Sequence, residues 1–166
     1  MTGHLVVVGL GQALRGDDVA GLEAVRLWER TFPPTATHPQ VRIEYAESPG
    51  LTLLSLLEGA TAALLVDAVQ SGSAPAGTVH LLSEADLPAF LQGAASAHGW
   101  GVAETLALAR QADLADLPVQ IVLLGVEMAQ AEVGAGLSPA VQEALPAVAL
   151  EIEKYVRAWL TQEAER

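Results

Sequence analysis

Apolar and polar positions follow two periods along this chain, which together predict a mixed α/β fold. Short apolar runs at 6–8, 62–66 and 121–126 indicate buried strands, and strict alternation at 41–45 indicates another strand. Apolar residues at helical spacing predict helices at 19–32, 51–57, 84–90, 102–111 and 139–160. Strand, helix, strand, helix, strand is the order typical of a parallel sheet.

The connection at 70–77 is too short for a parallel crossover, which needs about a dozen residues or more. We therefore expect the strand-like segment 78–82 to run antiparallel to the strand before it. Ser138 is the expected cap of the last helix, with Pro139 in its first turn. The prediction is a three-layer α/β/α sandwich on a five-stranded, mostly parallel mixed sheet, formed by one domain over 1–166.

Composition narrows the classes of partner and location. The chain has 166 residues, no cysteine and a formal net charge of -12, and its eight basic residues are scattered. This charge disfavours nucleic acid and anionic membranes, so we expect a protein, small-molecule or metal partner. No apolar run approaches the ~20 residues of a membrane span. Without cysteine or a secretory leader, a cytoplasmic location is expected.

Two acids, Asp17 and Asp18, follow the first strand and its two glycines, Gly9 and Gly11. A dinucleotide fingerprint would need a third glycine where Leu14 stands, and the two negative charges would repel a pyrophosphate. The carboxyl ends of the strands are where open α/β sheets bind ligands, so this turn predicts a cation site. Capping of the following helix is the alternative interpretation of these acids.

Asp67 ends the third predicted strand and, in a sheet where the first and third strands are neighbours, would face Asp18. His98 lies in a loop of small residues, whereas His80 lies within an apolar strand and is interpreted as structural. Two carboxylates and one imidazole suit a divalent transition ion and leave coordination positions open. A turn cap at Asp67 and a mobile surface histidine at 98 are the alternatives.

Four segments carry a family resemblance: GLGQALRGDDVAG, then LLVDAV with SGSAPAGTVH, then the loop of His98, then LLGVEMAQAEVGAGLSPAVQEALPAV. In that order the chain resembles the hydrogenase maturation proteases, which trim the C-terminal extension from the large subunit of nickel-iron hydrogenases. The resemblance implies a twisted five-stranded sheet. It also implies that Asp18, Asp67 and His98 are the metal-contacting and catalytic residues, with Asp17 left as a cap or a supporting group.

The resemblance implies an endopeptidase that acts on a nickel-loaded large-subunit precursor and uses the nickel as its recognition element. The nickel is expected to arrive with the substrate, although another divalent metal could serve, and metal-dependent and aspartic-type hydrolysis both stay open. Gln12 and Val19 replace the family's usual Asn and frequent Gly, which bears on the choice of precursor. The alternatives are a non-catalytic metal- or precursor-binding module and a peptidyl-tRNA hydrolase-like esterase, which would need a more basic surface.

Overall fold

The computed structural model describes residues 3–47, 50–90, 101–114 and 116–166. Its centre is a five-stranded sheet in the order β2-β1-β3-β5-β4. The pairs β1 with β2, β1 with β3 and β3 with β5 are parallel, and β4 is antiparallel to β5. The bounds of the strands are β1 (Leu5–Leu10), β2 (Val41–Ala46), β3 (Ala62–Val69), β4 (Val79–Ser83) and β5 (Gln120–Glu127). The mixed sheet and the antiparallel β4 predicted from the short 70–77 connection are confirmed.

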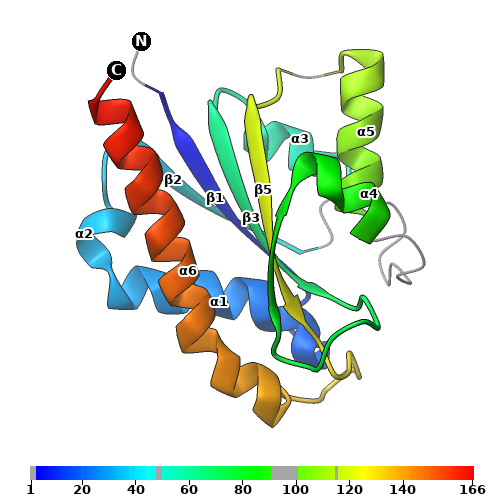
Figure 1. Ribbon diagram of the computed structural model, residues 1–166. Helices are drawn as coiled ribbons and strands as arrows, with labels where there is room; N and C mark the ends of the chain where they lie inside the picture. Colours follow the sequence, from blue (N-terminus) through cyan, green and yellow to red (C-terminus); the bar gives the residue numbers. More distant parts are fainter. Residues whose placement is uncertain (1–2, 48–49, 91–100, 115) are drawn as a thin grey trace.

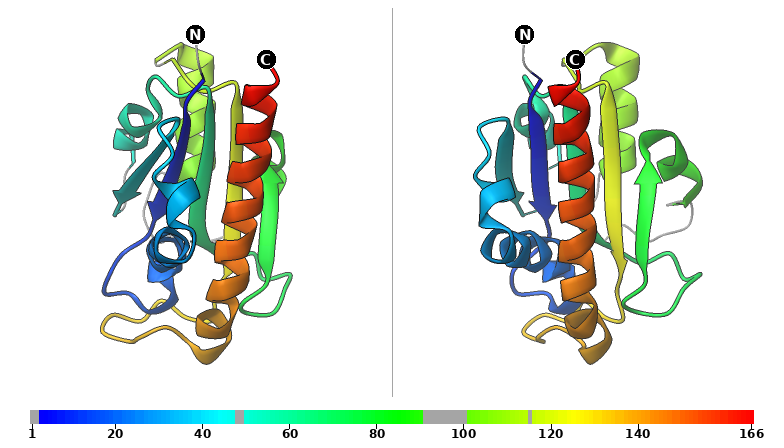
Figure 2. Two further views of the ribbon diagram at one scale, coloured as in Figure 1. Left: turned by 90° about the vertical axis from the view of Figure 1, so that its left-hand side faces the viewer. Right: turned by 60° about the vertical axis from the view of Figure 1, so that its left-hand side comes forward.

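Helices cover both faces of this sheet, as Figures 1 and 2 show. Trp28, Ile152 and Trp159 belong to the apolar core on one face, and Leu57, Leu87 and Leu106 to the core on the other. The first face is covered by α1 (Ala20–Thr31), α2 (Pro33–Ala36) and α6 (Pro139–Ala164). The second is covered by α3 (Thr52–Leu57), α4 (Leu87–Phe90) and α5 (Val102–Ala112). The three-layer prediction is confirmed.

The central strands are the most deeply buried elements, in agreement with their continuous apolar sequences. Every residue of β1 is buried, and so is every residue of β3 except Asp67. A strand covered by helices on both faces needs apolar side chains on both, which is why these segments do not alternate. In β2, at the edge of the sheet, polar and apolar residues do alternate.

Three local predictions need correction. β3 does not end at Asp67 but runs to Val69, because residues 67–69 continue to pair with 125–127 of β5. The two prolines at 33 and 34 end α1 but also begin the short helix α2, since proline is well tolerated in a first helical turn. The helix predicted at 84–90 consists of the 3-10 turn η2 (Glu84–Asp86) followed by α4, and the 3-10 turn η1 (Gly16–Val19) precedes α1. Within the described part of the chain, no helix is long and apolar enough to cross a membrane.

Candidate active site

The beginning of α1 lies very close to the carboxyl ends of β1 and β3. A Cβ placed on Gly21 would come within 2.3 Å of the carbonyl oxygens of both Leu10 and Val66. Only glycine allows a helix to approach two strand ends this closely. The glycine at 21 therefore brings the turn that precedes α1, with Asp18 in it, to the edge where β3 carries Asp67.

A second glycine shapes the same turn. Gly11 has a φ of 152°, and a Cβ there would lie 2.1 Å from the carbonyl oxygen of Asp18. The chain therefore folds back on itself between Gly11 and Asp18, which is 3 % exposed. The Gly-rich motif of this chain thus serves to pack a turn that carries acids.

Asp18 and Asp67 interact electrostatically although 48 residues separate them in the sequence. Burial, as the largest cause, and the negative charge of Asp18 raise the pKa of Asp67 from 3.8 to about 7, and a hydrogen bond from the backbone of Ala68 opposes this rise. Like charges disfavour each other's ionised form, and a nearby cation reverses this effect. The structure therefore brings together two of the three predicted site residues in an environment that favours a cation.

His98, the third predicted residue, lies outside the described residues, so its position relative to the two acids stays a prediction. Among the residues that the structure does describe, no group of three or more His, Asp or Glu side chains is placed to hold a metal ion. The pair Asp18 and Asp67 is thus the described part of the candidate site.

Asp17 does not cap α1, whose N-cap position is occupied by Val19. Its side chain is fully buried and points to the loop 128–138 between β5 and α6. Oδ2 accepts hydrogen bonds from the N–H groups of Ala129 and Gln130, at 2.8 and 3.2 Å, and from Oγ of Ser138 at 2.8 Å. Oδ1 accepts one from the N–H of Ser138 at 2.7 Å.

Ser138 occupies the N-cap position of α6, as predicted. Its hydroxyl donates to Asp17, so its side chain does not cap the helix.

Glu127, at the end of β5, is a buried acid that the sequence analysis missed. It accepts hydrogen bonds from the N–H and hydroxyl of Ser71 and from the N–H of Gly72, and lies 3.2 Å from Nε2 of His80. These contacts attach the 70–77 loop to the sheet. They also give His80 a partner in the structure, as expected for a structural histidine. An acid after an apolar strand, as at Asp67, is the signal that could have identified Glu127.

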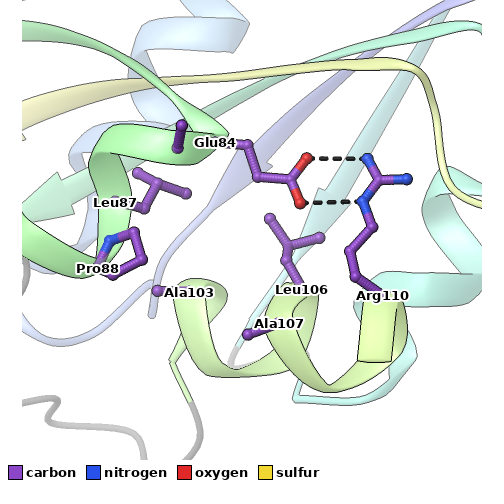
Figure 3. A pocket seen from close by; sticks show the side chains of 8 residues that line it. Glu84, Leu87, Pro88, Ala103, Leu106, Ala107 and Arg110 are labelled. Carbon is purple, nitrogen blue, oxygen red and sulfur yellow. Dashed lines mark hydrogen bonds and ion pairs between the residues drawn. The ribbon is translucent and has the colours of Figure 1, made fainter. Parts of the chain in front are cut away.

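A pocket of about 420 Å³ lies between α4 and α5, apart from the two acids. Figure 3 shows the bidentate ion pair at one end of it, where the guanidinium of Arg110 donates to Glu84 at 3.1 and 2.9 Å. The remaining lining is almost entirely apolar and consists of Ala85, Leu87, Pro88, Ala103, Leu106 and Ala107. Because Glu84 and Arg110 already bind each other, this pocket offers little charge to a ligand.

Solved structures with a similar fold include two hydrogenase maturation enzymes. The hydrogenase maturating endopeptidase HybD from E. coli superposes with a TM-score of 0.79 at 23% identity, over 93% of each chain. The [NiFe] hydrogenase maturation protease HybD from Thermococcus kodakarensis gives a TM-score of 0.71 at 22% identity, over 92% of this chain and 99% of that one. At these identities, the structural comparison establishes the fold.

Sequence comparison establishes the family. The model described as hydrogenase maturation protease matches residues 26–155, and the chain belongs to this family. The hydrogenase expression/formation protein HupD of Rhodobacter capsulatus is 31% identical over 158 residues, which are 94% of this chain and 72% of that protein. The hydrogenase 2 maturation protease of Escherichia coli (strain K12) is 28% identical over 148 residues, 89% of this chain and 87% of that protein.

Proposed function

We propose that this chain is an endopeptidase that removes the C-terminal extension of a nickel-loaded [NiFe] hydrogenase large-subunit precursor. In this proposal the nickel of the precursor contacts Asp18, Asp67 and His98. Family membership supports the reaction class. The observation that carries the assignment of the site is the electrostatic interaction between Asp18 and Asp67 at the carboxyl edge of the sheet.

This pair of acids gives the enzyme a physical means of distinguishing a loaded precursor from an empty one. Without a cation, the charge of Asp18 helps to keep Asp67 protonated near neutral pH. A divalent cation favours the ionised form of both carboxylates, and carboxylate and imidazole ligands suit nickel. Binding of the loaded precursor is therefore coupled to release of a proton from Asp67. An empty precursor brings no cation and lacks the attraction between the cation and the two carboxylates.

Topology supports the inclusion of His98. Asp67 alternates with Leu65 and Val69 along β3, and both of these belong to the apolar core that α3, α4 and α5 cover. Successive side chains of a strand point to opposite faces, so Asp67 shares the face of Leu65 and Val69. In the sequence, His98 stands between α4 and α5, two elements of that same face.

Cleavage of the peptide bond requires addition of water to the carbonyl carbon, breakage of the C–N bond and transfer of a proton to the leaving nitrogen. An ionised carboxylate at the site can accept the proton of the attacking water. We assign this role to Asp67, because the cation of the loaded precursor favours its ionised form. We place the reaction in the cytoplasm, in agreement with a sequence that contains no cysteine.

The test is incubation of the chain with a large-subunit precursor prepared with and without nickel, followed by mass spectrometry of the precursor. The expected result is loss of the extension from the nickel-loaded precursor only. Asp18→Asn, Asp67→Asn and His98→Ala should each abolish cleavage. Asp113→Asn is the matched control, because Asp113 is an exposed acid with a φ of 50° that asparagine tolerates well.

Two results would contradict the proposal. A stable complex with the loaded precursor, without any loss of mass, would show the alternative binding module. Full cleavage by all three site variants would show that the assignment of the site is wrong. The family match already favours a peptidase over a peptidyl-tRNA hydrolase-like esterase.

A further inference from the structure

The turn that carries Asp17 and Asp18 is joined to the loop 128–138 by backbone as well as side-chain contacts. The N–H of Asp17 donates to the carbonyl of Gln130 at 3.0 Å, and the N–H of Gly134 donates to the carbonyl of Leu14 at 2.8 Å. Arg15 and Val133 form an isolated antiparallel bridge. Both segments lie at the end of the sheet where β1, β3 and β5 finish, which is the lower end in Figure 2.

The carboxyl group of Asp17 is the centre of this junction. It is 0 % exposed and receives its four hydrogen bonds from residues that lie 112 to 121 positions further along the chain. Nothing in the proposed chemistry uses this acid. Its neighbour Asp18, however, is a candidate contact of the nickel.

We propose that Asp17 is a positioning residue that fixes the carboxylate of Asp18 relative to Asp67 by fastening the turn to the loop 128–138. This inference rests on the proposed function for its consequence in catalysis. The loop 128–138 then supports the site through its hydrogen bonds to Asp17, although none of its residues is a proposed nickel ligand.

A shift of Asp17 would also shift Asp18, because the two residues are adjacent in a short, constrained turn. η1 is four residues long, and adjacent Cα atoms are a fixed 3.8 Å apart, so the turn has little freedom to absorb a shift of Asp17. The backbone of Asp18 is confined further, since its N–H donates to the carbonyl of Arg15 at 3.0 Å and its carbonyl lies against Gly11. Displacements of about 1 Å at a catalytic group cost on the order of 100-fold in rate.

Asp17→Asn is the informative substitution because it keeps the shape of the side chain but replaces one of its two hydrogen-bond-accepting oxygens with an N–H₂ group, which can only donate. Three donors point at Oδ2 and one at Oδ1, so the new amide N–H₂ faces a donor in either orientation. We expect kcat on nickel-loaded precursor to fall on the order of 10- to 100-fold. Ser138→Ala removes one of the four donated bonds and should lower kcat by a smaller factor.

A purely structural role would lower stability without changing the activity of the folded molecules. Glu153→Gln calibrates that case, since Glu153 is also a buried acid and accepts hydrogen bonds from Trp28 and Thr35 at 2.9 and 2.8 Å. All variants are assayed below their melting temperatures, with kcat and KM measured separately and the affinity for Ni²⁺ alone measured by calorimetry. We expect Glu153→Gln to retain wild-type kcat and Ni²⁺ affinity, and Asp17→Asn to lose at least 10-fold in kcat.

The outcomes separate this inference from the proposed function. Wild-type cleavage by folded Asp17→Asn overturns the positioning role and leaves the proposed function intact. If the wild-type chain does not cleave, the proposed function fails, and Ni²⁺ affinity decides the positioning role: a loss in Asp17→Asn but not in Glu153→Gln supports it, and equal affinities overturn it. A wild-type chain that neither cleaves precursor nor binds Ni²⁺ overturns both.

Discussion

Two buried acidic regions of this protein differ in the groups that surround the acid: one is surrounded by hydrogen-bond donors, and the other by a second negative charge. Between α1, α2 and α6, the carboxyl group of Glu153 receives hydrogen bonds from Trp28 and Thr35 and has Arg157 at 3.9 Å. At the carboxyl edge of the sheet, Asp67 faces the negative charge of Asp18. A buried acid surrounded by donors links elements of the fold, whereas two acids placed against each other form an electrostatic arrangement that a cation completes.

Asp17 connects these two cases. Like Glu153 it is buried and accepts several hydrogen bonds, but it stands next to Asp18 in the sequence. The partners of an acid, and not its burial alone, therefore distinguish the acids that hold the fold together from the two acids of the candidate site.

The largest effect is expected when the charge of Asp18 or of Asp67 is removed. Asp18→Asn and Asp67→Asn each remove one negative charge from the candidate nickel contact and should reduce precursor cleavage by about 1,000-fold or more, through loss of a ligand and of the proton acceptor. Cleavage is followed by mass spectrometry of the nickel-loaded precursor. Circular dichroism should show an unchanged fold for both variants, and residual activity close to wild type would remove these acids from the site.

The next largest effect is expected where α1 approaches the strand ends. Gly21→Ala places a methyl group within 2.3 Å of two backbone carbonyl oxygens, so the helix must move away from β1 and β3. We expect a loss of about 3 kcal/mol in the free energy of unfolding, measured by urea denaturation. Gly136→Ala is the control, since a Cβ there meets nothing within 4 Å and should change stability by less than about 0.5 kcal/mol. Equal stability of the two variants would contradict the close approach.

Stability should also depend on pH through Asp67. Because its pKa is raised from 3.8 to about 7, the folded state holds a proton that the unfolded chain has already released between these values. The contribution of Asp67 to stability is therefore present at low pH and is lost as the pH rises from about 4 to about 7. Asp67→Asn cannot titrate, so at pH 8 it should be more stable than wild type by up to about 4 kcal/mol.

This pH effect is measured by urea denaturation of both proteins between pH 4 and pH 8. The stability difference between wild type and Asp67→Asn should grow with pH and then level off above pH 7. Parallel stability curves across this range would show that the pKa of Asp67 is not raised in the folded protein.

The smallest effect is expected in the region of Glu153. Trp28→Phe removes the indole N–H that donates to Oε2 of Glu153 at 2.9 Å and leaves a buried acceptor without that donor. A loss of about 1 to 2 kcal/mol in the free energy of unfolding follows from an unmade buried hydrogen bond. Precursor cleavage at a temperature where the variant is folded should equal that of wild type, and reduced cleavage by the folded variant would contradict the separation of the two regions.

Several parts of the molecule could be predicted because they depend on neighbours in the sequence. The apolar run 62–66 could be assigned to a central strand, and the short 70–77 connection correctly predicted that β4 is antiparallel. Prediction was poorer at the ends of elements. β3 extends past Asp67 because its last residues pair with β5, and no local pattern contains that partner.

The candidate site shows the same division. Asp67 was selected because it ends a strand expected to lie beside the strand that precedes Asp18, whereas Glu127, which also ends an apolar strand, was missed. The resemblance leaves Asp17 as a cap or a supporting group, and Ser138, predicted to cap α6, does occupy its N-cap position. That the N–H and hydroxyl of Ser138 donate to Asp17, 121 positions away, could not be predicted.

The sequence by itself determined the succession of strands and helices, the glycines at 11 and 21 and the acids at the strand ends, because these follow from side-chain periodicity and backbone sterics over a few residues. Only the tertiary structure decided that Asp67 faces Asp18 while Asp17 faces Ala129, Gln130 and Ser138. The physical reason is that both arrangements depend on the strand order β2-β1-β3-β5-β4, which brings together segments that are far apart in the sequence, and no short stretch of sequence contains that order.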